Sequence, residues 1–265
     1  MENKDSPGDS ITFLGTAGAR FMVINQFLAS GGIWLNLNGS EILIDPGPGC
    51  IVQVTKRKLR ADKLSAILLS HRHLDHAADT NIMVEAMTQG GFKRQGWLFA
   101  PSDALKTEPV IFSYLRDWLD GIEILQEGRS YSIGNISFAT PVRHVHPVET
   151  YGMVFRYAGH SFSYIADSRY FDGLCHSYGS ELLIINVVRL ENDNHPIDHL
   201  SVSDAAYIIK QLRPKTAIMN HFGMMVWRAK PWEVAERLSQ ETGVRVIAAR
   251  DGMRFDLSQL DGTIS

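Results

Sequence analysis

The chain has 265 residues, enough for one large domain or two small ones, and 45% of them are apolar and 21% charged, as in a folded globular protein. Its net charge of −3 argues against a large nucleic-acid-binding face, which would carry an excess of basic side chains. No apolar run reaches the length of a membrane span, so we expect no membrane-embedded segment.

The two cysteines, Cys50 and Cys175, are widely separated, which predicts a reducing compartment and no disulfide framework. Residues 1–10 are polar and lack the apolar core of a signal peptide. We therefore expect a cytoplasmic protein with a polar N-terminal tail over residues 1–10. Because no linker, repeat or low-complexity tract follows, residues 11–265 are expected to form a single domain.

The first part of the chain alternates apolar runs with turn-forming residues. The runs predict strands over residues 11–14, 32–37, 41–44, 66–70 and 97–100, with a hairpin turn at Asn38-Gly39. A sharp stop at Asp45-Pro46-Gly47-Pro48-Gly49 precedes a short basic helix. Helical patterns follow over residues 74–88 and 109–119.

The second part of the chain is also rich in short apolar runs. They predict strands over residues 122–125, 130–133, 136–140, 153–157, 161–165, 181–187, 216–220, 244–248 and 253–255. Helical spacing is found over residues 201–212 and over residues 231–242, which begin with proline. Two runs of strands with helices between them indicate a layered α/β domain.

The most informative segment is His71-Arg72-His73-Leu74-Asp75-His76, which places four metal-capable side chains within six residues. It follows an apolar run that predicts a buried strand. Because alternate residues of an extended chain point the same way, His71 and His73 can face one point. Asp75 and His76 then fall where a helix would begin. This one loop therefore offers two ligands to each of two adjacent metal ions.

Further candidate ligands lie at the ends of later strands. They are His144 or His146, which would face the same side of a strand, and then Asp167 and His221. Imidazole suits zinc and its neighbours, and an aspartate can bridge two cations. A lone histidine is more often structural, so these positions gain weight only together with the first loop.

These motifs, in this order, resemble the metallo-β-lactamase superfamily along most of the chain. The resemblance includes the early Phe13-Leu14-Gly15-Thr16 turn and Asp45 after an apolar strand. It implies a four-layer αββα sandwich with the metals at one edge of the two sheets. It also implies the ligands: His71, His73 and His146 for the first metal, Asp75, His76 and His221 for the second, and Asp167 as the bridge. Asp45 would support the ligands without binding metal.

Two features are similar to ribonuclease Z and its small phosphodiesterase relatives. The spacing from His146 to Gly152 favours His146 over His144 as the ligand, and His199 before Leu200-Ser201 matches a residue that assists the leaving group. The alternative for His199 is a contact at a helix start. Asp167 follows His146 by 21 residues, which leaves no room for the tRNA-binding arm of ribonuclease Z and argues against tRNA as a partner.

The resemblance implies a metal-dependent hydrolase. Two metals, zinc by default with manganese or iron as alternatives, would lower the pKa of a bridging water toward about 7, and the hydroxide would attack a phosphodiester. Asp75 would orient the nucleophile and His199 would protonate the leaving oxygen. We expect a small-molecule or short nucleotide substrate, with a homodimer as one possible assembly. The alternatives are a hydrolase of lactones, thioesters or other acyl bonds, and a non-catalytic metal-bound sensor.

The residues after the last ligand are unusually apolar. They are expected either to wall the substrate pocket or to pack in the core, and they are Phe222, Met224, Met225 and Trp227.

Overall fold

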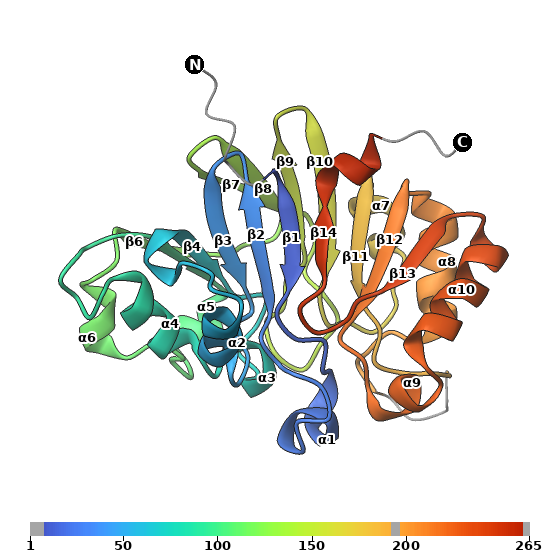
Figure 1. The fold of residues 1–265 in the computed structure, drawn as a ribbon, viewed down its shortest axis with the longest axis horizontal. Coiled ribbons are helices and arrows are strands. Elements are labelled where there is room, and N and C mark those ends of the chain that lie inside the picture. Colours follow the sequence, from blue (N-terminus) through green and yellow to red (C-terminus); the bar gives the residue numbers. More distant parts are fainter. Residues whose placement is uncertain (1–7, 192–196, 262–265) are drawn as a thin grey trace.

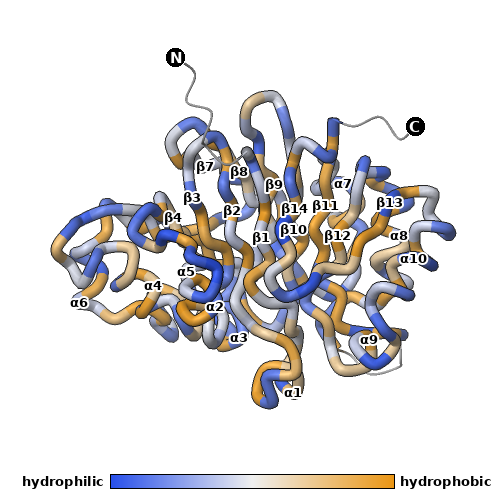
Figure 2. Tube along the Cα trace, in the orientation of Figure 1, coloured by the Kyte–Doolittle hydropathy of each residue, from blue (hydrophilic) through white to orange (hydrophobic). Residues whose placement is uncertain are grey.

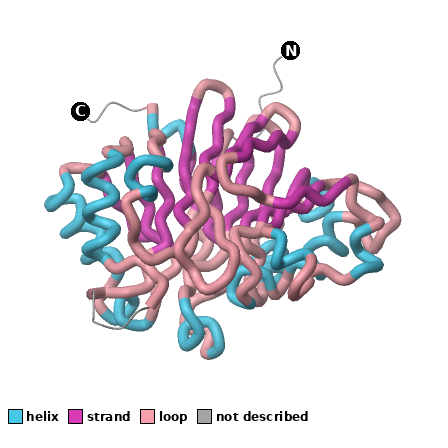
Figure 3. Tube along the Cα trace, turned by 180° about the vertical axis from the view of Figure 1, so that it is seen from behind, coloured by secondary structure: helices cyan, strands magenta, loops and turns pink. Residues whose placement is uncertain are grey.

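The computed structural model describes residues 8–191 and 197–261. Two β-sheets pack face to face, and helices cover the outer face of each sheet (Figure 1). Seen from behind, the strands again lie between two groups of helices (Figure 3). This arrangement confirms the expected four-layer αββα sandwich.

The first sheet has seven strands in the order β14-β1-β2-β3-β4-β5-β6. The strands are β1 (Ser10–Phe13), β2 (Ile33–Leu37), β3 (Ser40–Ile44), β4 (Leu64–Leu68), β5 (Trp97–Ala100), β6 (Gly121–Ile124) and β14 (Arg254–Asp256). Strands β3 to β6 run parallel, whereas β1 pairs antiparallel with both β2 and β14. The C-terminal strand therefore closes the edge beside the first strand.

The second sheet also has seven strands, in the order β13-β12-β11-β10-β9-β8-β7. The strands are β7 (Arg129–Ile133), β8 (Ile136–Thr140), β9 (Met153–Tyr157), β10 (His160–Ile165), β11 (Leu182–Asn186), β12 (Thr216–Asn220) and β13 (Arg245–Ala248). Strands β10 to β13 are parallel. Because parallel strands all end at one edge, the loops after β10, β11 and β12 meet there.

The helices flank this pair of sheets. They are α1 (Ala19–Ile24), α2 (Cys50–Lys56), α3 (Leu74–Ala77), α4 (Thr80–Met87), α5 (Ser102–Leu105), α6 (Ser113–Arg116), α7 (Gly173–Ser177), α8 (Val202–Leu212), α9 (Met224–Arg228) and α10 (Pro231–Thr242), with 3₁₀ turns η1 (Ala61–Lys63) and η2 (Leu257–Leu260). Ser201 begins α8 with a reciprocal capping box to Asp204, which satisfies free amides of the first turn. Among the described residues, no helix is both long and apolar enough to span a bilayer.

The core between the sheets is apolar and rich in aromatic side chains. Phe99, Phe138 and Phe155 are buried there, and Phe155 stacks on Phe162 at a centroid distance of 4.5 Å. Many strand segments are coloured as hydrophobic in Figure 2, and hydrophilic segments are found in the helices and loops around them. Burial of both sheet faces fixes the strand register, and with it the positions of the loops that follow the strands.

The expected elements differ from the structure mainly in short helices. The helix predicted over residues 74–88 is split into α3 and α4, because Asp79 leaves the helical pattern and its carboxylate accepts a hydrogen bond from the Ile51 amide. The helix predicted over residues 109–119 is reduced to α6. Helices α1, α5, α7 and α9 were not expected, because four to six residues are too few to show helical periodicity.

The N-terminal boundary also differs from the expectation. Ser10, assigned to the tail from sequence, begins β1 and pairs with Asn36 and Asp256. The Asp9 carboxylate accepts a hydrogen bond from the Asn38 amide. Residues 1–7 of the expected tail lie outside the described residues. Cys50 is buried, Cys175 is partly buried, and neither forms a disulfide.

Candidate metal centre

The predicted ligands meet at the edge of the sandwich where the parallel strands end. Three groups of side chains have donor atoms within 4.8 Å of one another. One group is His71, His73 and His146, a second is Asp75, His76 and His221, and a third is His71, His76 and Asp167. The third group shares residues with the other two. The structure thus brings all seven predicted ligands into one cluster.

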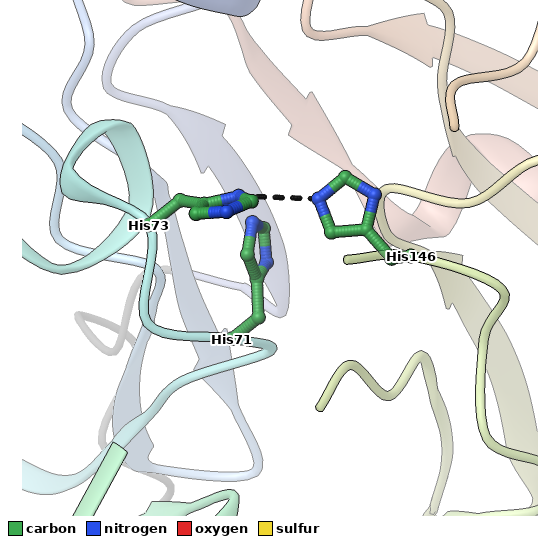
Figure 4. A group of neighbouring side chains, drawn as sticks. All are labelled: His71, His73 and His146. Carbon is green, nitrogen blue, oxygen red and sulfur yellow. Dashed lines mark hydrogen bonds between the residues drawn. The ribbon is translucent and has the colours of Figure 1, made fainter. Parts of the chain in front are cut away.

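The first group consists of three converging imidazoles (Figure 4). His73 Nδ1 lies 3.1 Å from His146 Nε2. The His71 ring is fully buried, and its Nδ1 lies 3.0 Å from the Ser70 hydroxyl. Its Nε2 is also buried but has no hydrogen-bond partner within the described part of the chain. Because such an unpaired nitrogen is costly, a cation at this position would fit the residues present.

The second group combines imidazoles with carboxylates. His76 Nε2 lies 3.2 Å from His221 Nε2, and Asp167 Oδ2 lies 3.4 Å from each of these nitrogens. Asp75 Oδ2 lies 3.6 Å from His221 Nε2. Ligand atoms around tetrahedral zinc, with bonds of about 2.0–2.1 Å, are roughly 3.3 Å apart. The observed separations are therefore close to those expected for atoms that bind a common divalent ion.

Asp45 holds the base of the cluster together. Its carboxylate accepts hydrogen bonds from the Ser70 amide and hydroxyl, both at 2.7 Å, and from the Tyr164 hydroxyl at 2.9 Å. Its Oδ2 also lies 3.0 Å from His76 Nδ1. The backbone of Asp45 has a φ of +53°, a strained value for a residue that is not glycine. Asp45 thus directs the Nε2 atom of His76 toward the cluster, in the supporting role expected from sequence.

Two residues that sequence reasoning missed extend this network. The Asn186 amide donates to the Tyr164 hydroxyl at 3.2 Å and to Asp167 Oδ1 at 2.9 Å. The second oxygen of Asp167 is therefore left to face the histidines. Asn186 is the last residue of the apolar strand β11, and His221 directly follows the apolar strand β12. A polar residue at the end of such a strand could have been predicted from sequence to lie near the ligands. The role of Tyr164 could not be predicted from sequence, because nothing in the sequence distinguishes it from an ordinary aromatic residue of the core.

We call this buried assembly the floor of the site, consisting of Asp45, Ser70, Tyr164, Asp167 and Asn186. All five residues are at most 4% exposed.

His144 and His146 occupy different environments. His144 Nδ1 lies 3.2 Å from the Asp167 carbonyl oxygen, and its Nε2 lies 2.8 Å from the Tyr178 hydroxyl. Both of its nitrogens are therefore engaged within the protein. His146 instead directs Nε2 toward the cluster while its Nδ1 lies 2.9 Å from the Asp198 carbonyl oxygen. This geometry supports His146 as the ligand.

His199 lies at the margin of the cluster. Its Nδ1 is 3.4 Å from Asp167 Oδ2, and its ring is 5.2 Å from that of His146. The side chain is 19% exposed. Burial lowers the pKa of His199, and the Asp167 carboxylate acts in the opposite direction. The residue predicted to assist the leaving group is thus close to the ligands and partly open to solvent.

Burial keeps His71 and His73 of the first group neutral. It lowers the pKa of His71 well below the ordinary value, and it lowers the pKa of His73 to about 4. Only the neutral imidazole binds a cation. These two nitrogens are therefore ready to bind at neutral pH without first losing a proton.

Asp167 and His76, which lie side by side at the second group, shift each other's pKa. Burial would raise the pKa of Asp167, but His221, His199 and His76 together hold it well below its usual range. Burial would also lower the pKa of His76, yet the carboxylates of Asp167 and Asp75 raise it well above its usual range. A cation bound at this group would displace the proton from His76.

A clasp outside the cluster joins two of the ligand loops. Arg72, between the first two histidines, donates from Nε to Asp103 Oδ2 at 3.0 Å and also pairs with Glu108. The same Asp103 oxygen accepts from the Glu149 amide at 3.1 Å, and the Asp103 amide donates to the Glu149 carboxylate at 3.2 Å. Glu149 lies three residues after His146. Asp103 therefore ties the loop of His146 to the first ligand loop.

The four apolar residues after the last ligand differ in how deeply they are buried. Phe222 is buried in the hydrophobic core beside the second sheet, which agrees with the core-packing alternative given for these residues. Met224 is partly buried against α1. Met225 and Trp227 are exposed.

Comparison with known proteins gives a consistent result. Residues 40–222 match the family model described as the β-lactamase superfamily domain. An uncharacterized protein of Methanocaldococcus jannaschii is 33% identical over 93% of this chain and 94% of its own length. A ribonuclease Z of Borreliella afzelii is 32% identical, but over only 33% of this chain and 27% of its own length.

Solved structures share the fold. The metallo-β-lactamase fold protein YhfI of Bacillus subtilis superposes with a TM-score of 0.78 at 21% identity, covering 94% of this chain and 99% of that one. A diphosphatase from the PhnP family superposes with a TM-score of 0.68 at 19% identity, covering 94% and 97%. Since the family model spans more than half of the sequence, this chain belongs to the β-lactamase superfamily of metallo-hydrolases.

Proposed function

We propose that this protein is a hydrolase that uses two divalent metal ions to cleave a phosphodiester bond in a small-molecule or short nucleotide substrate. One observation carries the proposal. Seven ligand side chains from four separate loops converge into two groups, and Asp167 lies beside one histidine of each group, His71 and His76, above a floor of buried hydrogen bonds. Such a floor is expected where ligands must be held in place before the metal binds.

The ligand types agree with two ions of similar chemistry. The first group has three imidazoles, and the second has two imidazoles and a carboxylate. Imidazole and carboxylate together suit zinc, manganese or iron, and zinc is our default. When bound, two such ions would supply Lewis acidity for the phosphoryl oxygens and a water of lowered pKa as the nucleophile.

The protein residues then have distinct tasks. Asp75 lies at the second group, with its Oδ2 3.6 Å from His221 Nε2, where it can orient the nucleophile as well as bind. His199 is the candidate proton donor for the leaving oxygen. To act as an acid it must be protonated, and the Asp167 carboxylate 3.4 Å away favours that form while burial opposes it.

Two features support a small phosphodiester as the substrate. In the described structure the chain passes from His146 to Asp167 through the short β9–β10 hairpin, which has no arm that could grip a tRNA. The partial match to ribonuclease Z and the fold shared with a diphosphatase are compatible with chemistry at phosphorus. Cytoplasmic location and a homodimeric assembly stay predictions.

The test is hydrolysis of bis(p-nitrophenyl) phosphate by protein reconstituted with zinc or manganese. We expect turnover that depends on the metal and is lost in Asp167→Ala. Lactone and thioester substrates are assayed in parallel. Turnover of these substrates alone would replace the phosphodiester proposal with acyl hydrolysis. Binding of two metals without turnover of any substrate class would favour a sensor.

A further inference from the structure

Six large apolar side chains are exposed at the same edge as the candidate metal centre. We call them the apolar rim; their exposed fractions range from 37% to 78%, and they are Phe21, Ile24, Phe27, Leu74, Met225 and Trp227. Single exposed apolar residues are ordinary, but a group of this size beside a ligand cluster marks a binding surface. None of these six residues belongs to the floor of the site.

The rim is attached directly to the ligand loops. Leu74 lies between the ligands His73 and Asp75 and is 78% exposed. Met225 and Trp227 belong to α9, which begins three residues after His221. Helix α1 contacts both α3 and α9 and projects from this edge of the molecule (Figure 1). The rim therefore borders the donors on more than one side.

Helix α1 is anchored by one face and leaves the other open. Met22 and Val23 are buried against Ala17 and Met224, whereas Phe21 and Ile24 are each 71% exposed. Orange segments mark apolar residues in both α1 and α9 (Figure 2). The short spacing from Phe21 to Ile24 places both on one side of the helix. The exposed face is thus part of an ordered element.

Backbone contacts fix α1 to the loop of His221. Ala17 forms a bridge with Phe222, and the Gly18 amide donates to the Phe222 carbonyl at 2.9 Å. A Cβ atom at Gly18 would lie 2.2 Å from the His221 carbonyl oxygen, so only glycine permits this approach. Phe27 also stacks on Trp227 with a centroid distance of 5.5 Å and an interplanar angle of 11°. The position of the rim relative to the ligand atoms is therefore fixed by the backbone.

We propose that the apolar rim binds an uncharged aromatic or alkyl ester group of the substrate, so that the preferred substrates are phosphodiesters with an apolar ester arm. The inference rests on the proposed function. An ester arm is joined to the phosphoryl group that the ligands would position, so it must lie against the rim that borders them. Neither α1 nor α9 contains an acidic residue that would repel the anionic diester.

Binding of two inert diesters tests this proposal without relying on turnover. Diphenyl phosphate and dimethyl phosphate carry the same charge and differ only in their ester arms. We expect the zinc-loaded protein to bind diphenyl phosphate at least about tenfold more tightly, measured by isothermal titration calorimetry, because burial of apolar surface favours the larger arms. Leu74→Ser and Trp227→Ala should each reduce this ratio to about twofold.

Phe92→Ser provides the matched control. Phe92 is 96% exposed and follows α4, away from the ligand loops. The affinity ratio should be unchanged in this variant. A ratio that falls equally in the control and in the rim variants would overturn the proposal, since the loss would then reflect general surface hydrophobicity.

The rim proposal and the proposed function fail in different ways. Equal affinity for the two diesters, with hydrolysis of bis(p-nitrophenyl) phosphate intact, would overturn the rim proposal alone. Tighter binding of diphenyl phosphate without hydrolysis of any diester would overturn the catalytic proposal and support the rim. Self-association or adsorption to phosphatidylcholine vesicles that Leu74→Ser and Trp227→Ala both abolish would assign the rim to a second copy or a lipid surface, against the proposal.

Discussion

The floor and the rim of the candidate metal centre lie close together but are built in opposite ways. The floor is buried and polar, and the Asp45 carboxylate alone accepts three hydrogen bonds. The rim is exposed and apolar, and its main side-chain contact is the stacking of Phe27 on Trp227. The difference indicates that the two regions have separate functions. The floor fixes the ligands, and the rim is free to select what binds beside them.

This comparison has an energetic consequence. Removing one partner from a buried polar network leaves the other unpaired, which costs about 1–3 kcal/mol. Changing an exposed side chain usually alters stability by at most about 0.5 kcal/mol. Substitutions in the floor should therefore affect metal binding and stability together, whereas substitutions in the rim should leave metal binding unchanged.

The largest effect is expected at Asp167, which joins the floor to both ligand groups. Asp167→Asn preserves the shape but removes the charge, so metal-dependent hydrolysis should fall by at least about 1000-fold, or about 4 kcal/mol of transition-state stabilisation. Steady-state rates measure the loss of catalysis, and the metal content per chain measures the loss of metal binding. A variant with full activity would remove Asp167 from the site.

Acidification should destabilise the metal-free protein through His144, which is packed beneath Asp167. Burial lowers the pKa of His144 from 6.5 to about 4. A lowered pKa stabilises the fold above pH 6.5, and this stabilisation is lost as the pH falls toward 4. The difference corresponds to about 3 kcal/mol.

Urea unfolding of the metal-free protein between pH 7 and pH 4 measures this loss. His144→Gln should show a shallower dependence than the natural chain, because Gln carries no titrating group. Parallel curves for the two proteins would show that other residues, such as His73, account for the acid sensitivity.

The next effect concerns Asp45, the central acceptor of the floor. Asp45→Asn should weaken metal binding by about 10–100-fold, because supporting groups orient the ligands without touching the metal. Competition with a chromophoric chelator gives the affinity. The same variant should unfold at lower urea concentration. Natural affinity in Asp45→Asn would mean that the ligands hold their positions without the floor.

A smaller effect is expected at the clasp outside the cluster. Asp103→Ala removes the shared acceptor of Arg72 and the Glu149 amide, so the affinity of the first metal should fall by up to about tenfold. Arg60→Ala breaks an exposed ion pair with Asp62 and is the matched control. If both variants bind metal equally well, the clasp does not position the ligands.

The smallest effect on the metal centre is expected in the rim. Trp227→Ala should leave metal affinity unchanged and lower the free energy of unfolding by about 1 kcal/mol, because it removes the stacking on Phe27 without breaking any hydrogen bond to the ligands among the described residues. Chelator competition and urea unfolding measure both quantities. A large loss of metal affinity would contradict the separation of floor and rim.

The sequence by itself determined a layered α/β domain and the candidate ligands at its strand ends, and the resemblance to the metallo-β-lactamase superfamily added the αββα sandwich and the choice among those ligands. Spacing along the chain predicts the local geometry of these residues. His71 and His73 alternate along an extended segment and so face one side, and Asp167 and His221 each follow an apolar run that forms a strand. Parallel strands then bring such ends to one edge whatever the details of packing. That is why the predicted ligands were found together.

The tertiary structure alone decided what supports and borders that cluster. The contact between Tyr164 and Asp45 joins residues 119 positions apart, and no local pattern distinguishes this tyrosine from a core aromatic. The engagement of both nitrogens of His144 depends in part on Tyr178, which lies 34 positions further along the chain. A helix as short as α1 shows no periodicity in the sequence, so it could not be predicted. The rim could therefore be recognised only in the tertiary structure, where α1, α9 and the first ligand loop lie at one edge. Such contacts are set by packing between distant segments, which spacing along the chain does not record.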